Sequence, residues 1–197
     1  LRRIGMGAPL NLPFKGAGKA QIRMPKKNKR GQYTNWYGTT LPWMSIGYET
    51  QVPPRYTLTF YNASANNGRM MQPRFVKATV KNGDTLTAYP PQVVKGREQI
   101  ASEKTIKIMQ DLLHRVVING TGKKANSPNF WVCGKTGTAM IAKNGSYKGA
   151  PNHLLSFAGW FGEKDKPYYS CIVCIQKQGL PAYGWMSGQE SNDTAEG

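Results

Sequence analysis

Three strand-like runs in the second half of the chain constrain the fold more than any other feature of the sequence. The runs cover residues 130–140, 154–161 and 168–176, and turn-forming segments around Gly145 and at 164–167 separate them. Consecutive strands with short connections pair antiparallel, because a parallel pair needs a crossover of a dozen or more residues. We therefore predict an antiparallel sheet in which these three strands are neighbours.

Two helices are predicted before this sheet. Residues 55–66 follow Pro53-Pro54 and precede an Asn-Gly pair, which is the usual punctuation of a helix start and end. Ser102 can cap a second helix that has Glu103 in its first turn and stops at Gly120. Apolar side chains recur on one face of this second helix, at Ile106, Met109, Leu112, Leu113, Val116 and Val117.

The order of these elements predicts an α+β fold in which helices pack on an antiparallel sheet. An Asn-Gly pair at 82–83 adds a β-hairpin between 75–80 and 85–89. The 197 residues are enough for one domain with a hydrophobic core. Along that domain we expect an irregular basic segment at 1–48, a helix–sheet body at 49–188 and a polar tail at 189–197.

The charge of the chain is high and uneven. The net charge is +17, nine of the Lys and Arg residues precede Glu49, and the densest cluster lies at 23–30. Such a cluster fits a solvated basic loop, a contact with an anionic surface such as a membrane or cell wall, or a nucleic-acid contact. No RNP-like strand or zinc finger accompanies it, so we do not expect a nucleic-acid partner.

Cysteine and histidine residues give no metal pattern. Cys171 and Cys174 have C-x-x-C spacing, but they fall within the strand 168–176 and no second Cys/His pair completes a site. We expect both cysteines to be core residues, and we expect no metal and no cofactor. His114 and His153 lack partners for metal or triad chemistry and are expected at the surface or at a helix boundary.

The segment 133–139, Cys-Gly-Lys-Thr-Gly-Thr-Ala, is the strongest candidate for function. It follows directly on the apolar start of a predicted strand, and glycine inside a strand often marks a close approach by a ligand or another chain. Lys-Thr-Gly is also one of the motifs of serine-acylated penicillin-binding proteins and β-lactamases. Alone the motif is weak, and an ordinary solvent-facing strand end is the alternative.

Several further segments, in the same order, resemble the transpeptidase domain of class B penicillin-binding proteins. The similar segments are 44–54, 66–76, 120–125, 135–138, 156–161 and 168–175. They span roughly residues 41 to 187, whereas the first forty residues resemble the family only loosely. The resemblance implies a penicillin-binding-protein transpeptidase fold, similar to that of the serine β-lactamases.

Parts of the family pattern are missing. No Ser-x-x-Lys, the family's nucleophile motif, occurs in the sequence, and Ser64 and Ser127 match the family's Ser-x-Asn motif only in the wrong places. The family continues into an apolar helix after Gly188, where this chain is polar and acidic. The chain also begins without Met, so we expect an incomplete, carboxyl-terminal portion of one domain whose sheet exposes apolar surface.

The resemblance assigns roles to four residues. Lys135 and Thr138 would be catalytic, the Thr138 backbone N–H being one donor to the oxyanion. The Thr136 and Thr138 hydroxyls would hold the terminal carboxylate, and Gly137 would let the peptide backbone approach the strand edge. Strand alternation puts Lys135 on the face opposite the two threonines, so its side chain must reach round an edge strand.

The implied function is that of a β-lactam-sensitive D,D-transpeptidase that cross-links peptidoglycan stem peptides. Its parent protein would be anchored by an N-terminal span at the extracytoplasmic face of the bacterial inner membrane. Cell-wall synthesis proteins would be its partners, with division favoured over elongation. The 197 residues alone would form no adduct with penicillin, because they lack the serine. The alternative is a non-catalytic basic module that binds an anionic polymer or surface.

Overall fold

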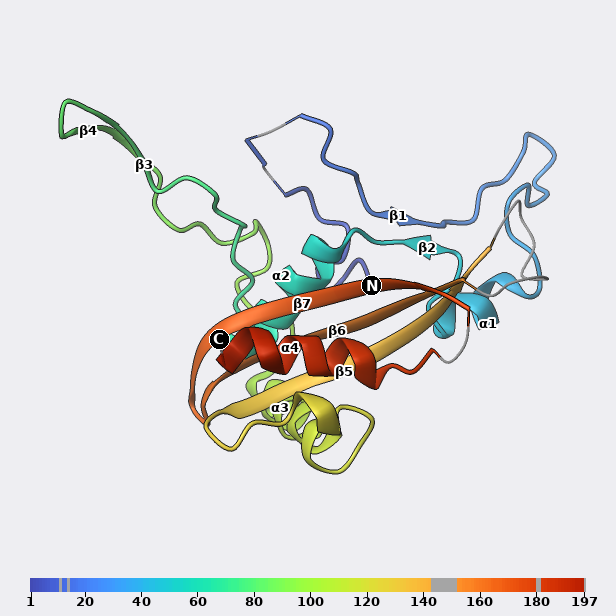
Figure 1. The fold of residues 1–197 in the computed structure, drawn as a ribbon. Helices are drawn as coiled ribbons and strands as arrows, with labels where there is room; N and C mark the ends of the chain where they lie inside the picture. Colours follow the sequence, from blue (N-terminus) through green and yellow to red (C-terminus); the bar gives the residue numbers. More distant parts are fainter. Residues whose placement is uncertain (11, 14, 143–151, 180–181, 197) are drawn as a thin grey trace.

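The three carboxyl-terminal runs form one antiparallel sheet, as predicted. A computed structural model describes residues 1–10, 12–13, 15–142, 152–179 and 182–196. The sheet has the order β5-β6-β7, and its strands are β5 (Trp131–Ile141), β6 (Asn152–Glu163) and β7 (Lys166–Gln178) (Figure 1). Each neighbouring pair is antiparallel. The turn predicted around Gly145 lies outside the described residues.

Two predicted helices cover one face of this sheet. Helix α2 (Pro54–Ala65) starts with a proline, and helix α3 (Glu103–Ile118) starts after Ser102. The Ser102 hydroxyl oxygen accepts a hydrogen bond from the Thr105 backbone N–H at 3.2 Å, which caps the helix as expected. Both helices pack on the sheet through a cluster of buried side chains, which comprises Ala65, Leu113, Cys133 and Trp160.

Helix α4 (Trp185–Glu196) lies on the opposite face (Figure 1). Its Ser191 hydroxyl lies 3.1 Å from the Cys171 thiol of β7. A Cβ atom on Gly188 would lie 3.8 Å from the Phe157 ring of β6. The residues expected to form a polar tail at 189–197 are therefore helical as far as Glu196, and this helix completes a three-layer arrangement of helices, sheet and helix.

A second buried cluster joins the end of α3 to the α4 side of the sheet. It contains Val117, Ala125, Val132 and Phe157, with Ala125 in the short helix η1 (Lys123–Ala125). This cluster fixes the turn between α3 and β5 beside the strand that carries the Lys-Thr-Gly segment. The turn therefore lies directly beside that segment.

The remaining elements are small. The predicted hairpin is present as β3 (Ala78–Lys81) and β4 (Asp84–Ala88), and it projects from the body (Figure 1). Its turn residues Asn82 and Gly83 have φ values of 53° and 92°, as a two-residue turn of this kind requires. The first 51 residues, expected to be irregular through residue 48, contribute β1 (Gln21–Ile22), α1 (Thr40–Ser45) and β2 (Thr50–Gln51), and β1 pairs with β2.

Three predictions about single residues are wrong. Cys174 is exposed rather than part of the core, although Cys171 is half-buried. His114 and His153 are both buried rather than at the surface. The His114 ring stacks on Trp131 with 3.4 Å between ring centroids, and its Nδ1 atom lies 2.8 Å from the Val132 carbonyl oxygen. A backbone partner and an aromatic ring therefore make burial of this histidine possible.

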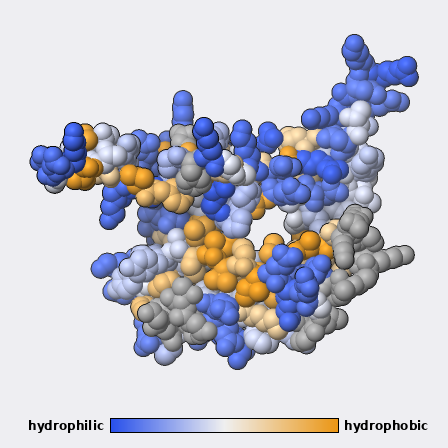
Figure 2. Space-filling view, turned by 45° about the horizontal axis from the view of Figure 1, so that its top comes forward, coloured by the Kyte–Doolittle hydropathy of each residue, from blue (hydrophilic) through white to orange (hydrophobic). Residues whose placement is uncertain are grey.

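Apolar side chains are nevertheless exposed on the sheet, as expected. They include Met140, Ile141 and Leu154. Figure 2 shows hydrophobic side chains gathered in the middle of one face of the molecule, between hydrophilic segments. Among the described helices, none is both long and apolar enough to cross a membrane.

Candidate active site

The Lys-Thr-Gly-Thr segment lies in the middle of an edge strand. Within the described residues, β5 pairs only with β6, so its other edge carries no strand. Lys135 is opposite Ala158 in the register, and Thr138 is opposite Leu155. An edge strand presents unpaired backbone N–H and C=O groups along its free side. The segment can therefore offer both side chains and backbone groups to an extended ligand.

The two threonines point to the α4 side of the sheet. The residue before α4, Gly184, packs directly against them. A Cβ atom at Gly184 would lie 3.1 Å from Thr138 Oγ1 and 3.3 Å from Thr136 Cβ. Any larger residue at position 184 would press on both side chains, so this glycine shapes the space around the threonine hydroxyls. The sequence prediction missed this residue.

Lys135 starts on the opposite face but turns round the free edge of β5. Its Nζ atom donates a hydrogen bond to the Thr136 carbonyl oxygen at 2.8 Å and lies 3.4 Å from Thr136 Oγ1. The alternation of the strand required this path if the lysine and the threonines were to share one site. The ammonium group and the Thr136 hydroxyl are thus brought together at the open edge.

A fourth side chain, that of Thr121, joins this group. Its Oγ1 atom lies 2.8 Å from Thr136 Oγ1, so Thr136 is held between Thr121 and Lys135. The turn that carries Thr121 is tight: the N–H groups of Gly120 and Gly122 both bond to the Val116 carbonyl oxygen at 3.0 Å. The sequence signal for this contact is the Gly-Thr-Gly triplet at 120–122, just before the strand. The sequence prediction included the triplet in the family resemblance but gave Thr121 no role.

Gly137 has a packing role in the structure. A Cβ atom at this position would lie 2.5 Å from Ser156 Oγ on the neighbouring strand. The glycine therefore accommodates Ser156 in the register that aligns β5 with β6. Its proposed role in admitting a ligand's backbone stays a prediction.

Cys133 and the serines of the two Ser-x-Asn matches show no sign of activation as nucleophiles. Burial raises the pKa of the Cys133 thiol to about 12, so this thiol is protonated at neutral pH. Ser64 donates to the Phe60 carbonyl oxygen within α2, and Ser127 Oγ accepts from the Asn129 N–H. The two Ser-x-Asn matches therefore make local hydrogen bonds.

Two cavities lie away from the segment, beside the turn between β6 and β7. One of about 450 Å³ is lined by α2 and the start of β7, and one of about 480 Å³ is lined by α2, α3 and the same turn. Neither is lined by a residue of 135–138. The Lys-Thr-Gly-Thr site is an open strand edge, and it is chemically suited to an anionic, extended ligand rather than to an enclosed small molecule.

The sequence and the fold both match known proteins. Residues 2–195 match the family described as the penicillin binding protein transpeptidase domain. Stage V sporulation protein D of Bacillus subtilis is 32% identical over 131 residues, which are 66% of this chain and 20% of that protein. The peptidoglycan D,D-transpeptidase FtsI homolog of Mesostigma viride is 27% identical over 151 residues, which are 70% of this chain and 24% of that protein.

A solved structure supports the fold. Penicillin binding protein 3 from Mycobacterium tuberculosis, in its apo form, superposes with a TM-score of 0.76 at 24% identity. The match covers 99% of this chain and 44% of that one. The α+β fold with helices on an antiparallel sheet is therefore confirmed as that of part of a transpeptidase domain. The chain spans about a fifth of the length of the curated relatives it matches.

Proposed function

Because the chain belongs to the penicillin-binding-protein transpeptidase family, we propose that it is part of a D,D-transpeptidase that cross-links peptidoglycan. The reaction is serine acyl transfer from D-Ala-D-Ala stem peptides, with a Ser-x-x-Lys nucleophile supplied by sequence outside these 197 residues. β-Lactams would acylate the same serine. The protein would act at the extracytoplasmic face of the bacterial inner membrane, with cell-wall synthesis proteins as partners and division favoured as its role.

One observation carries the proposal. The Lys135 ammonium turns round the free edge of β5 and bonds to the Thr136 carbonyl oxygen at 2.8 Å. A positive charge and hydroxyl groups at an open strand edge suit a peptide that adds as a further strand and ends in a carboxylate. If the Lys135 ammonium had bonded only to groups on the face opposite the threonines, a site shared by these residues would be excluded.

The proposed chemistry gives each of these groups a separate role. The serine attacks the carbonyl of the penultimate D-Ala, and the Thr138 backbone N–H stabilises the oxyanion together with the N–H of the serine. The Thr136 and Thr138 hydroxyls hold the terminal carboxylate. Lys135 contributes positive charge, which favours anionic ligands at the site. The free D-Ala then leaves, and an amine of a second stem peptide takes the acyl group.

Acylation of the full-length protein by a fluorescent penicillin tests this assignment. Thr138→Val removes the hydroxyl and keeps both the backbone N–H and the β-branched shape. A hydrogen bond to a charged partner contributes roughly 1.5–3 kcal/mol, so the acylation rate constant should fall about ten- to a hundredfold. Thr138→Ser keeps the hydroxyl and serves as the matched control, with a rate near that of the wild type. Equal rates for Thr138→Val and the wild type would show that the site is misplaced.

The genomic sequence that precedes Leu1 gives an independent test. The proposal requires Ser-x-x-Lys and Ser-x-Asn upstream at the spacing of this family. Their absence would leave the non-catalytic basic module as the better account of the chain.

A further inference from the structure

The neighbours of the Thr136 hydroxyl determine how it can bind a carboxylate. Among the described residues, two polar atoms lie within hydrogen-bond range of Thr136 Oγ1: Thr121 Oγ1 at 2.8 Å and Lys135 Nζ at 3.4 Å. The Thr136 side chain is also buried. Because burial leaves the hydroxyl few other partners, these two neighbours and a ligand share its hydrogen-bonding capacity.

The direction of each hydrogen bond follows from the chemistry of the partners. A threonine hydroxyl has one proton to donate and two lone pairs that accept. An ammonium group only donates, so Lys135 takes one lone pair of Thr136 Oγ1. A carboxylate only accepts, so Thr136 can bind it only by donating its single proton. The Thr121 hydroxyl must then donate to the remaining lone pair of Thr136 Oγ1.

The opposite direction of the threonine–threonine bond is incompatible with a bound carboxylate. If Thr136 donated to Thr121, its proton would be used and only lone pairs would face the carboxylate oxygens. Acceptors that face each other repel, and an acceptor buried without a donor costs free energy. The 2.8 Å contact itself permits either direction, and a carboxylate selects the one in which Thr121 donates.

The turn that contains Thr121 is anchored on both sides of this residue. The N–H groups of Gly120 and Gly122 both donate to the Val116 carbonyl oxygen, at the end of α3. A Cβ atom at Gly120 would lie 2.8 Å from that oxygen, so position 120 has no room for a side chain. Backbone contacts therefore place the Thr121 hydroxyl before a ligand arrives, which lowers the entropy cost of binding.

We propose that Thr121 is a positioning residue of the carboxylate site. Its hydroxyl donates to Thr136 Oγ1 and so directs the Thr136 proton to the carboxylate of the acyl donor. Because hydrogen bonds in a chain polarise one another, this donation also makes Thr136 a stronger donor. The inference rests on the function proposed above, and it adds to the site a residue from outside the strand that carries Lys-Thr-Gly-Thr.

Acylation of the full-length protein by a fluorescent penicillin measures the effect. Thr121→Val removes the donor and keeps the β-branched shape. The second-order rate constant of acylation should fall about three- to tenfold, as expected for the loss of one hydrogen bond between neutral groups. Thr121→Ser keeps the hydroxyl, and its rate constant should lie within about twofold of the wild-type value.

A double-mutant cycle with Thr136→Val separates this role from a general loss of structure. Thr136→Val removes the hydroxyl through which Thr121 acts, and it should itself slow acylation about ten- to a hundredfold. Adding Thr121→Val to the Thr136→Val protein should then slow acylation by less than about twofold. A residue that only stabilises the fold would slow acylation by the same factor in both backgrounds.

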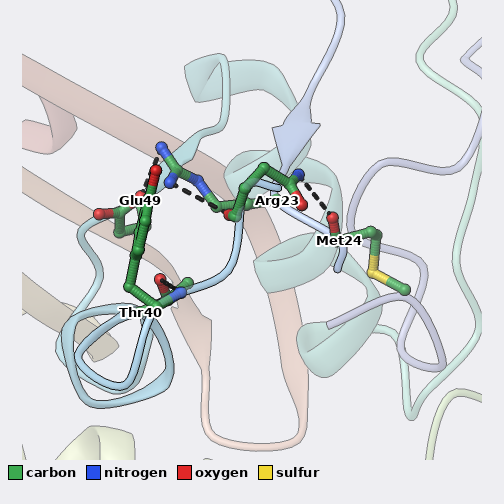
Figure 3. A network of polar contacts seen from close by, with 6 residues as sticks. Arg23, Met24, Thr40 and Glu49 are labelled. Carbon is green, nitrogen blue, oxygen red and sulfur yellow. Dashed lines mark hydrogen bonds and ion pairs between the residues drawn. The ribbon is translucent and has the colours of Figure 1, made fainter. Parts of the chain in front are cut away.

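A threonine in another network of polar contacts provides the matched control. Figure 3 shows Thr40, which lies at the start of α1. It is buried, and its hydroxyl oxygen accepts from the Tyr37 N–H at 3.1 Å. Thr40→Val therefore also removes one hydrogen bond of a threonine hydroxyl, but its acylation rate constant should stay within about twofold of the wild-type value. Thermal unfolding of each full-length variant checks that it is folded.

The outcomes distinguish this inference from the proposed function. A loss in Thr121→Val that Thr121→Ser restores, and that Thr136→Val cancels, supports the positioning role. If the wild type and Thr121→Val are acylated equally fast, the positioning role is wrong and the proposed function stands. An equal loss with and without Thr136→Val would also overturn it, because Thr121 would then act on the fold. If the full-length wild type forms no adduct, the proposed function fails and this inference fails with it.

Discussion

The two edge strands of the sheet, β5 and β7, look similar in the sequence but differ in what covers them. On β5, Cys133 packs with Leu113 of α3 and with Trp160, and is almost fully buried. On β7, Cys174 is exposed and so is Tyr169. Each cysteine has apolar neighbours in its own strand, so the difference comes from helices supplied by distant parts of the chain.

The comparison shows why the edge of β5 fits the proposed site better than the edge of β7. Beside β5 lie the Thr121 turn and Gly184, and these two neighbours fix the Thr136 hydroxyl and bound the space around Thr138. Beside β7 lie α2, whose Asn62 donates to Ser170 Oγ at 3.2 Å, and α4. Fixed polar groups on a rigid support are what a binding site requires.

The largest expected effect is a difference in thiol reactivity between the two edges. Burial raises the pKa of Cys133 to about 12, so only about one molecule in ten thousand carries its thiolate at pH 8. Burial also raises the pKa of Cys174, but this thiol is exposed to reagent. Iodoacetamide should modify Cys174 at least about a thousandfold faster than Cys133 in the native chain. Peptide mass spectrometry after timed labelling measures both rates.

The pH dependence has a defined sign. A raised pKa favours the neutral thiol, so the Cys174 rate should grow about tenfold per pH unit below its pKa. In a denatured sample the two rates should converge, which is the control for intrinsic reactivity. Equal rates in the native chain would mean that α3 does not cover β5 as described.

A second prediction concerns the packing of β6 against its two neighbours. A Cβ atom on Gly159 would meet the Cys133 carbonyl oxygen and would lie 2.9 Å from Gly134 Cα, both in the backbone of β5. Gly159→Ala should therefore lower the free energy of unfolding by about 3 kcal/mol or more. Cys171→Ala removes only a partly buried thiol from β7 and should cost about 1 kcal/mol. Urea unfolding of both variants provides the comparison, and a smaller loss for Gly159→Ala would reverse it.

The smallest effect concerns the hydroxyl pair beside β5. Thr121→Val removes the partner that lies 2.8 Å from Thr136 Oγ1, and it should lower the free energy of unfolding by about 1 kcal/mol. Thr121→Ser retains the hydroxyl and should match the wild type within about 0.5 kcal/mol. If both variants unfold alike, Thr121 does not hold Thr136 in place.

Sequence patterns predicted the parts of the fold that are locally encoded. The strands, the Ser102 cap and the Asn82-Gly83 turn follow from alternation, capping and turn chemistry at single positions. Strand alternation also predicted that the Lys135 side chain must pass round an edge strand to reach the threonines. Its hydrogen bond to the Thr136 carbonyl oxygen fits this path. The catalytic and substrate-binding roles of these residues remain predictions.

The sequence pattern did not predict helix α4, because small polar residues occupy the face that packs on the sheet. Ser187 and Ser191 are buried, and each has a partner: Ser187 donates to the Gly184 carbonyl oxygen at 2.8 Å, and Ser191 lies beside Cys171. A helix whose buried face is polar gives no apolar periodicity. The sequence also did not predict the burial of His114. Its partners Trp131 and Val132 lie on a strand that comes near α3 only in the folded chain.

A crystal structure of the full-length protein acylated by a penicillin tests the central claim most directly. The claim is that the free edge of β5, with Lys135 turned round it, binds the acyl group. The ligand carboxylate should lie within 3.2 Å, the usual hydrogen-bond limit, of the Thr136 or Thr138 hydroxyl. Its acyl carbonyl oxygen should accept from the Thr138 N–H. An acyl group seated in the cavities beside the β6–β7 turn, or on the face of the sheet covered by α2 and α3, would contradict the account.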